Sequence, residues 1–330
     1  MIQPAMETRS IGTVVTIASG PDVYRELAIN LARSFCHWNE GSDLAFIICT
    51  DRLFPLPSDI SSVKLLCYNP AECGSHFSPK LYLDKILPPG PTLFVDGDCL
   101  VLGLLTPIFE KYRGQSFVIP GDVAEVGDFY TDIAALLKRT GLPWMPSLVT
   151  SVYFWTNTAQ ESPVFATARS YESRYDDLNL WRLRGQCSDE PLLAIGMATH
   201  GIRPIEDDGW LKADCHQFSA PPSINVQRGI ARFHHHTPTI PRPNLPLIEE
   251  ARPLIGHFNA TYAFQSPYTR EAAVLRWTRS QRWPVKPARI VAYLRYTLPQ
   301  QIEGWAKNLL RPLFRQLFGY RRILKDPRSV

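Results

Sequence analysis

Residues 91–101 read Pro91-Thr-Leu-Phe-Val-Asp-Gly-Asp-Cys-Leu-Val101, which places two carboxylates, Asp96 and Asp98, directly after an apolar run. The run Thr92–Val95 predicts a buried strand, and side chains two residues apart at a strand end point the same way. Two carboxylates held so close need a cation between them to stay ionised, and oxygen ligands suit Mn²⁺ or Mg²⁺. Gly97 lets a large ligand approach the backbone. The stretch therefore predicts a divalent-metal site, with a surface turn bearing two solvated acids as the alternative.

Strands and helices alternate along the first half of the chain. Apolar runs predict strands at Thr13–Ala18, Leu44–Thr50, Val63–Tyr68 and Phe117–Ile119, and apolar residues at helical spacing predict helices at Tyr24–Trp38 and Pro79–Leu87. This rhythm is typical of an α/β fold with a mostly parallel central sheet flanked by helices. Ligands bind at the carboxyl ends of the strands in such sheets, so we expect Ser19, Asp51 and Asp96 to share one edge.

The second half of the chain has a less regular pattern. Leu148–Thr156 predicts a strand, and Pro163–Tyr175 and Pro191–His200 predict helices. Five prolines between residues 238 and 253 predict an ordered loop or lid with little helix or interior strand.

The C-terminal segment differs from the rest in charge. From Arg270 to the end, 14 Lys and Arg stand against 3 Asp and Glu, a net +11 in a chain of +4, so residues 1–269 carry −7. We therefore divide the chain into a body of residues 1–270 and a basic, amphipathic helical tail of residues 271–330. Pro312 is expected to kink the tail helix or to split it in two.

Large apolar residues recur at helical spacing from Ile302 to Phe318, while Lys307, Arg311 and Arg315 follow another face of the same helix. A basic helix with Trp and Phe on its apolar side is typical of one that lies in an anionic membrane interface. The alternative is a helix packed on the body with a solvated basic face. No apolar run is long enough to predict a transmembrane helix.

Seven cysteines at irregular spacing, with no CxxC pair, argue against a zinc ribbon and a disulfide framework. They favour a reducing cytoplasm, and with the tail they predict peripheral association at the inner face of the membrane. The acidic body argues against a nucleic-acid partner.

Three neighbouring segments, Ser78–Pro88, Leu93–Val101 and Leu105–Glu110, together resemble the core of the family-eight glycosyltransferases. Shorter matches occur at Thr16–Gly20 with Tyr24, at Ser188–Ala194 and at Leu254–Phe258, so that the resemblance spans Thr13 to His257. It implies a GT-A fold, which is Rossmann-like, and a hexosyltransferase that takes a nucleotide sugar, with a UDP-sugar as the expected donor.

The resemblance also implies roles for particular residues. It implies donor-binding residues at Ala18, Ser19, Tyr24, Lys80, Asp96, Gly97, Asp98 and Asp122. Mn²⁺, or Mg²⁺, would be held by Asp96, Asp98 and His257, with His236 as the alternative histidine, and would neutralise charge on the leaving nucleoside diphosphate. For Lys80 the alternative is an ordinary ion pair with Asp84, four residues on.

Asp189 and Glu190 are the acids that the resemblance puts beside the reacting sugar, and it implies retention of anomeric configuration. A carboxylate there can act as nucleophile or stabilise positive charge. It can also act as a general base, which leaves inversion open. The alternative is a helix N-terminus with two acids on its dipole. The usual Asn and Gly are absent from residues 149–155, and Phe258 follows the histidine without the usual Gly and Lys.

The sequence thus predicts a metal-dependent glycosyltransferase that acts on a glycan or a lipid-linked acceptor at the membrane face. A haloacid-dehalogenase-type phosphohydrolase with Asp96 as nucleophile is one alternative, because its motif is also an apolar strand followed by two spaced aspartates. A non-catalytic binder of sugar nucleotides is the other.

Overall fold

The structure is a computed structural model that describes residues 11–158, 161–235 and 248–320. Its centre is a six-stranded sheet with the strand order β3-β2-β1-β4-β9-β6. The first four strands in that order are parallel, while β9 runs antiparallel to β4 and to β6. The strands are β1 (Gly12–Ala18), β2 (Leu44–Thr50), β3 (Lys64–Cys67), β4 (Gly90–Val95), β6 (Phe117–Val118) and β9 (Val152–Asn157). The predicted mostly parallel sheet is confirmed.

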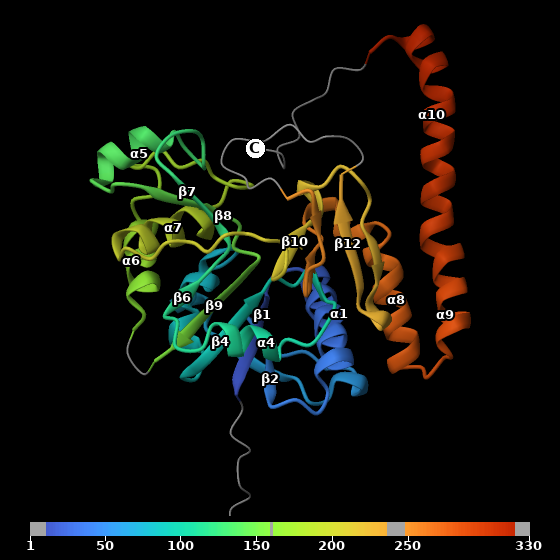
Figure 1. The fold of residues 1–330 in the computed structure, drawn as a ribbon, viewed down its shortest axis with the longest axis horizontal. Coiled ribbons are helices and arrows are strands. Elements are labelled where there is room, and N and C mark those ends of the chain that lie inside the picture. The colour runs from blue at the N-terminus through green and yellow to red at the C-terminus, as the bar shows by residue number, and fades with distance from the viewer. Residues whose placement is uncertain (1–10, 159–160, 236–247, 321–330) are drawn as a thin grey trace, which may run out of the picture.

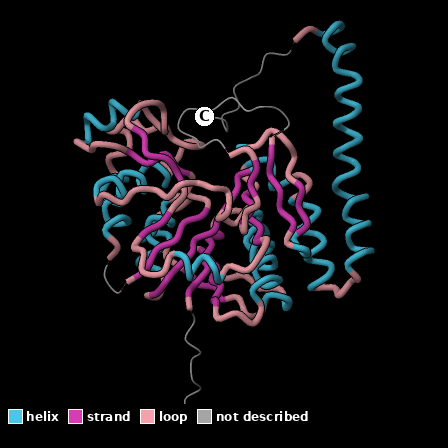
Figure 2. The backbone as a smooth tube through the Cα atoms, viewed as in Figure 1, coloured by secondary structure: helices cyan, strands magenta, loops and turns pink. Residues whose placement is uncertain are grey.

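Helices cover both faces of this sheet (Figures 1 and 2). Val14 and Val15 are adjacent in β1, so they point to opposite faces, and each belongs to a different core cluster. The Val14 cluster includes residues of α1 and α4, and the Val15 cluster includes residues of α6 and α7. The helices are α1 (Asp22–Asn39), α2 (Pro70–Cys73), α3 (Leu83–Ile86), α4 (Thr106–Lys111), α5 (Ile133–Thr140), α6 (Pro163–Glu172) and α7 (Asp189–Thr199). Because β1, β2 and β4 are parallel, their carboxyl ends lie at the same edge of this layered sheet.

Short strands beyond the central sheet form three smaller sheets. In one of them β14 (Ile255–His257) lies between β10 (Lys212–Asp214), parallel to it, and β5 (Cys99–Val101), antiparallel to it. Antiparallel pairing also joins β11 (Ser223–Asn225), β12 (Ile230–His234) and β13 (Glu250–Ala251), and separately β7 (Gly121–Ala124) and β8 (Met145–Leu148). Because β5 follows directly on residues 96–98, the β10-β14-β5 sheet brings distant parts of the chain to that turn.

The strand predicted over Leu148–Thr156 is confirmed as β9, but it begins four residues later than predicted, and Leu148 belongs to another strand. β8 ends at Leu148 and pairs with β7, whereas β9 begins at Val152 and joins the central sheet. The three residues between them turn the chain from one sheet to the other. The proline-rich loop lies mostly outside the described residues, because residues 236–247 are among those that the structure does not describe.

The C-terminal segment is packed at its start and exposed at its end. Helix α8 (Tyr268–Arg279) crosses the predicted boundary at residue 270 and contributes Leu275 to the core, and α9 (Val285–Ala292) packs against α8. Helix α10 (Leu298–Phe318) has no buried residue and extends away from the body (Figure 1). Within the described ranges, no helix has the length and apolar character needed to cross a membrane.

Pro312 lies inside α10, which is one continuous helix from Leu298 to Phe318, so the predicted split does not occur. Proline removes one backbone hydrogen bond from the carbonyl four residues earlier. Because that turn of α10 is exposed on all sides, water can satisfy the freed carbonyl. The helix therefore continues at a modest cost.

Candidate active site

The predicted edge of the sheet is built where β1, β2 and β4 end. Asp51 follows β2 and accepts a hydrogen bond from the backbone N–H of Gly20, at 2.9 Å from N to Oδ2. The Arg25 guanidinium on α1 lies 3.3 Å from the other oxygen of Asp51. Burial acts to raise the pKa of Asp51, but the Gly20 N–H and Arg25 lower it below its usual value. The carboxyl ends of β1 and β2 thus lie side by side, joined by the contacts of Asp51 with Gly20 and Arg25.

Lys80 joins the two groups of predicted site residues. Its Nζ lies 2.9 Å from Asp96 Oδ1 at the end of β4 and 3.4 Å from Asp189 Oδ2 in the first turn of α7. The alternative ion pair with Asp84 does not form, because Asp84 is bound instead by the Arg169 guanidinium, 2.6 Å from Nη1 to Oδ1. Lys80 therefore contacts both Asp96 and Asp189, two carboxylates that are far apart in sequence.

The ionisation of Asp96 reflects its burial. Removal from water raises its pKa to about 6, and the nearby Asp98 adds to the rise, while the positive charge of Lys80 acts against it. Lys80 itself stays charged, because its two carboxylate partners outweigh the effect of burial and raise its pKa.

Asp189 and Glu190 form the first turn of α7, after Ser188 caps the helix by accepting the Glu190 N–H. Both acids contact the turn between β8 and β9. Thr150 Oγ1 donates to Asp189 Oδ2 at 2.6 Å, and the Thr150 N–H donates to Glu190 Oε1 at 3.3 Å. The alternative interpretation, a capped helix N-terminus, is thus correct for the backbone. It does not explain why the two acidic side chains point toward Thr150 and Lys80.

Glu190 has the more strongly perturbed ionisation of the two acids. Burial and the adjacent Asp189 raise its pKa to about 7, against a hydrogen bond from Tyr130, the charge of Lys80 and the Thr150 N–H. A carboxyl group with such a pKa exchanges a proton readily near neutral pH. The pair therefore combines an acid held by Lys80 with one that can take up or release a proton.

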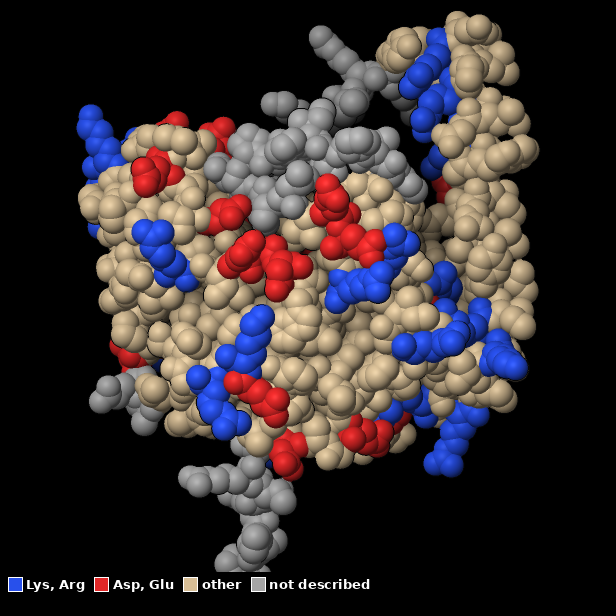
Figure 3. Space-filling view, in the orientation of Figure 1, with Lys and Arg blue, Asp and Glu red and all other residues tan. Residues whose placement is uncertain are grey.

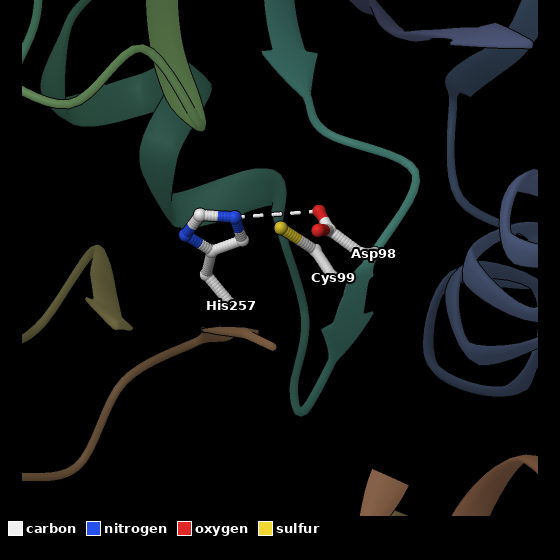
Figure 4. A group of neighbouring side chains, drawn as sticks. All are labelled: Asp98, Cys99 and His257. Atoms are coloured by element: carbon white, nitrogen blue, oxygen red, sulfur yellow. Dashed lines mark ion pairs between the residues drawn. The ribbon is translucent and has the colours of Figure 1, made fainter. Parts of the chain in front are cut away.

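Figure 4 shows the group of side chains suited to a metal ion, Asp98, Cys99 and His257. His257 Nε2 lies 3.3 Å from Asp98 Oδ1, a separation at which one cation can bind both atoms. The Cys99 thiol is the weakest of the three as a ligand, because burial beside Asp98 and Asp96 raises its pKa well above the ordinary value. The carboxylate is a ligand type that Mn²⁺ and Mg²⁺ prefer, whereas imidazole also suits Zn²⁺ and other transition metals.

The predicted ligand Asp96 is not in this group of three, because its carboxylate faces Lys80. Its role as a metal ligand stays a prediction. Burial lowers the pKa of His257, but Asp98 and a further carboxylate, Asp214, outweigh it and raise the pKa to about 10. The imidazole thus lies between two carboxylates that favour a positive charge, which either a proton or a metal ion can supply.

Asp214 and its partner Lys212 are site residues that the sequence reasoning missed. Asp214 closes β10, is fully buried and is hydrogen-bonded to His257 Nδ1, while Lys212 Nζ donates to Asp214 Oδ2 at 2.8 Å. The only signal in the sequence is the spacing Lys212-Ala-Asp214 within an otherwise apolar segment. That spacing does not reveal that β10 pairs with the strand that carries the histidine.

Anionic groups exceed cationic ones in this cluster. Five carboxyl groups, those of Asp96, Asp98, Asp189, Glu190 and Asp214, lie with the two lysines Lys80 and Lys212. With His257 neutral, as a metal ligand must be, the cluster lacks positive charge. The residues present therefore fit a divalent cation.

The other predicted site residues have the following places. Ala18 ends β1 and is buried, Ser19 is hydrogen-bonded to Tyr68, and Tyr24 is exposed in α1. A Cβ at Gly97 would meet Ala28 and Leu27 at ordinary contact distances, so the fold itself does not require glycine there. Asp122 lies on β7, where burial and Glu206 raise its pKa, and no contact joins it to Lys80 or Asp96 among the described residues. His236 lies outside the described residues.

Comparison with protein-family profiles and with curated protein sequences finds no match. Solved structures do match. The galactosyltransferase LgtC, in complex with donor and acceptor sugar analogues, is similar over 88% of this chain and 99% of its own, with 14% identity and a TM-score of 0.51. The bifunctional glycosyltransferase WbbM is similar over 89% of this chain and 53% of its own, with 12% identity and a TM-score of 0.51. The predicted fold is therefore confirmed: this chain has the GT-A fold that LgtC and WbbM share.

Proposed function

We propose that this protein is a divalent-metal-dependent glycosyltransferase that moves a sugar from a nucleotide-sugar donor to a glycan or lipid-linked acceptor. The observation that carries the proposal is the Lys80 bridge. It joins Asp96, beside the candidate metal group, to Asp189, beside a carboxyl group with a pKa near 7. A reaction that separates an anionic leaving group from a positively charged sugar needs both kinds of group at once.

The donor side of the site combines residues that would bind a divalent cation with residues that would bind the anionic diphosphate. Asp98 and His257 would hold Mn²⁺ or Mg²⁺, with Asp96 as a further ligand, and the ion would neutralise charge on the nucleoside diphosphate. Lys80 would pair with the diphosphate or the donor sugar, and Asp122 would contact that sugar. Ala18, Ser19 and Tyr24 lie at the end of β1 and the start of α1, where the nucleotide of a UDP-sugar would bind.

Asp189 and Glu190 would act at the reacting carbon. Asp189 is held by Thr150 Oγ1 and Lys80, so its carboxylate group is fixed in place. That arrangement suits a carboxylate that stabilises an oxocarbenium-like centre or attacks the sugar carbon as a nucleophile. Nucleophilic attack by the enzyme, followed by transfer to the acceptor, would retain the anomeric configuration. Glu190 would take the proton of the acceptor hydroxyl, because its pKa lies near neutrality.

Helix α10 supports action at a membrane face. Its large apolar residues are exposed, among them Trp305 at 67% and Leu317 at 67% of full exposure. Figure 3 shows basic side chains along one side of α10 and uncharged ones along the other. Such a helix lies with its apolar side in the headgroup region and its basic side toward anionic lipid. The cytoplasmic location at the inner membrane face is part of this proposal.

Donor use is tested with a panel of nucleoside diphosphates and nucleotide sugars, each with and without Mn²⁺, by thermal shift and by transfer assay. We expect a Mn²⁺-dependent stabilisation by one nucleotide that is lost in Asp98→Ala and kept in Glu110→Ala, an exposed carboxylate on α4. A well-folded protein that responds to no nucleotide would refute both the transferase and the non-catalytic binder of sugar nucleotides. A nucleotide-dependent thermal shift without transfer would instead favour the non-catalytic binder. The GT-A fold gives no support to the phosphohydrolase.

Membrane binding is tested by co-sedimentation with vesicles that contain 30% phosphatidylserine, roughly the anionic content that attracts basic helices, and with neutral vesicles. We expect binding to the anionic vesicles alone, falling with added salt. Reversal of charge at Lys307, Arg311 and Arg315 should abolish that binding. Equal binding to neutral vesicles, or none by the wild type, would refute this part of the proposal without affecting donor use.

A further inference from the structure

The three-stranded sheet β10-β14-β5 aligns one residue from each strand beside the candidate metal group. In its register Asp214 of β10 faces His257 of β14, and His257 faces Cys99 of β5. Paired residues on neighbouring strands point to the same face, so these side chains form a row. Asp98, the carboxylate nearest to the imidazole Nε2, precedes Cys99 directly. The imidazole therefore contacts Asp214 through Nδ1 and Asp98 through Nε2.

Asp214 is held in this row by more contacts than a simple ion pair requires. One carboxylate oxygen, Oδ1, is hydrogen-bonded to His257 Nδ1 and accepts from Ser151 Oγ at 3.4 Å. The other oxygen, Oδ2, accepts from Lys212 Nζ at 2.8 Å. Asp214 is fully buried, and Lys212 is 2% exposed. The carboxylate thus has no freedom to turn away from the imidazole.

These contacts select one arrangement of the histidine ring. When the Nδ1–H of the neutral ring donates a hydrogen bond to Asp214, the lone pair of the ring is on Nε2, the atom that faces Asp98. Metal-bound histidines characteristically donate their second ring N–H to a carboxylate in this way, which fixes the tautomer and orients the ligand. Lys212 balances the charge of Asp214, so that the carboxylate can remain ionised in the interior without taking the ring proton.

We infer that Asp214, supported by Lys212 and Ser151, is a positioning residue that presents His257 Nε2 to the divalent cation. The inference rests on the metal dependence in the proposed function and adds to it a residue that acts only through the histidine. The alternative is a structural ion pair that stabilises the sheet and has no effect on the metal. The two roles differ in what happens to metal affinity when the charge of Asp214 is removed.

The chain offers a matched control for this test. Glu271 is another fully buried carboxylate that accepts from two arginines, with Arg270 Nε at 2.8 Å and Arg289 Nη2 at 3.1 Å, but it contacts no histidine. Asp214→Asn and Glu271→Gln both remove a buried charge at nearly constant shape. Each should lower the melting temperature, so stability alone does not separate the two roles.

The measurement is titration of Mn²⁺ into the full-length chain by calorimetry, alone and with saturating UDP. We expect the Mn²⁺ dissociation constant to rise about 10- to 100-fold in Asp214→Asn and to stay within twofold of wild type in Glu271→Gln. Unchanged affinity in Asp214→Asn, or an equal loss in Glu271→Gln, would overturn the positioning role alone. A wild type that binds no Mn²⁺ in either condition would overturn it together with the metal dependence in the proposed function.

If Asp214→Asn does not fold, ¹⁵N NMR of the histidine rings in the Mg²⁺-loaded wild type decides the question, with His257→Gln used for assignment. We expect the His257 proton on Nδ1 and a metal-induced shift of Nε2. A proton on Nε2, or a ring unaffected by Mg²⁺, would overturn the inference.

Discussion

The buried cluster around Lys80 and the exposed helix α10 both carry closely spaced charges, but the two regions hold them in opposite ways. In the cluster each charge is buried or half-buried and has named partners, as Asp189 has Lys80 and Thr150. In α10 no residue is buried and the basic side chains are solvated. Loss of one group from the cluster leaves its partners unpaired, whereas loss of one from α10 changes only a sum of weak effects. We therefore assign the reaction to the cluster around Lys80 and membrane attachment to α10.

The largest effect tests whether the buried cluster performs the chemistry. Asp189→Asn keeps the shape of the side chain and the bond from Thr150 but removes the negative charge beside the reacting sugar. We expect kcat for transfer to fall at least about 10³-fold, equivalent to about 4 kcal/mol of transition-state stabilisation. The thermal shift produced by UDP and Mn²⁺ should remain. A variant with wild-type kcat would assign Asp189 to the helix cap alone.

A second effect tests whether the cluster depends on specific partners for stability. Lys80→Met leaves the buried Asp189 and the half-buried Asp96 without their shared cation, so we expect urea unfolding to show a loss of about 3 kcal/mol. The control is Lys85→Met, because the Lys85 partner Glu161 is exposed and surface ion pairs contribute little. Equal stability of the two variants would contradict this prediction, because the ion pairs of Lys80 would then contribute no more than the exposed pair of Lys85.

A third effect concerns pH. Burial and Asp189 raise the pKa of Glu190 from 4.5 to about 7, so ionisation of this group opposes folding. Its cost is absent below the unfolded pKa, grows as pH rises from about 4.5 to about 7, and is constant above. The free energy of unfolding of wild type, relative to Glu190→Gln, should fall over that window by about 2 kcal/mol, less than the full shift because the side chain is partly exposed. Parallel pH profiles of the two proteins would contradict this assignment.

The parts of the fold that the sequence predicts are those set by local patterns. The apolar runs that became β1, β2 and β4 are each recognisable from their own residues, although the pairing of β1 with β4, two strands later than β2, is not. The turn at Asp96 and Asp98 follows from the strand before it. Local pattern also explains the boundary error at Leu148–Thr156, because the turn between β8 and β9 at residues 149–151 does not interrupt the run clearly.

The parts of the site that the sequence does not predict depend on distant pairing. Asp214 sits on a strand of three residues that is recognisable only through its pairing with β14, 43 residues away at His257. Lys80 was predicted as a site residue, but its helical spacing from Asp84 suggested the wrong ion pair. The actual partner of Asp84 is Arg169, 85 residues on. Long-range contacts of single polar groups leave no periodic signal in the sequence.

The smallest effect tests the exposed side of the comparison. Truncation after Gly304 removes most of α10, including Trp305 and the basic residues, but keeps Gln300, whose side chain accepts the Ser266 N–H at 2.8 Å. Since α10 has no buried residue, we expect the free energy of unfolding to change by less than about 0.5 kcal/mol, while binding to anionic vesicles is lost. A loss of several kcal/mol would instead mean that the helix packs on the body in solution. The amphipathic surface would then belong to the fold, and attachment would need another explanation.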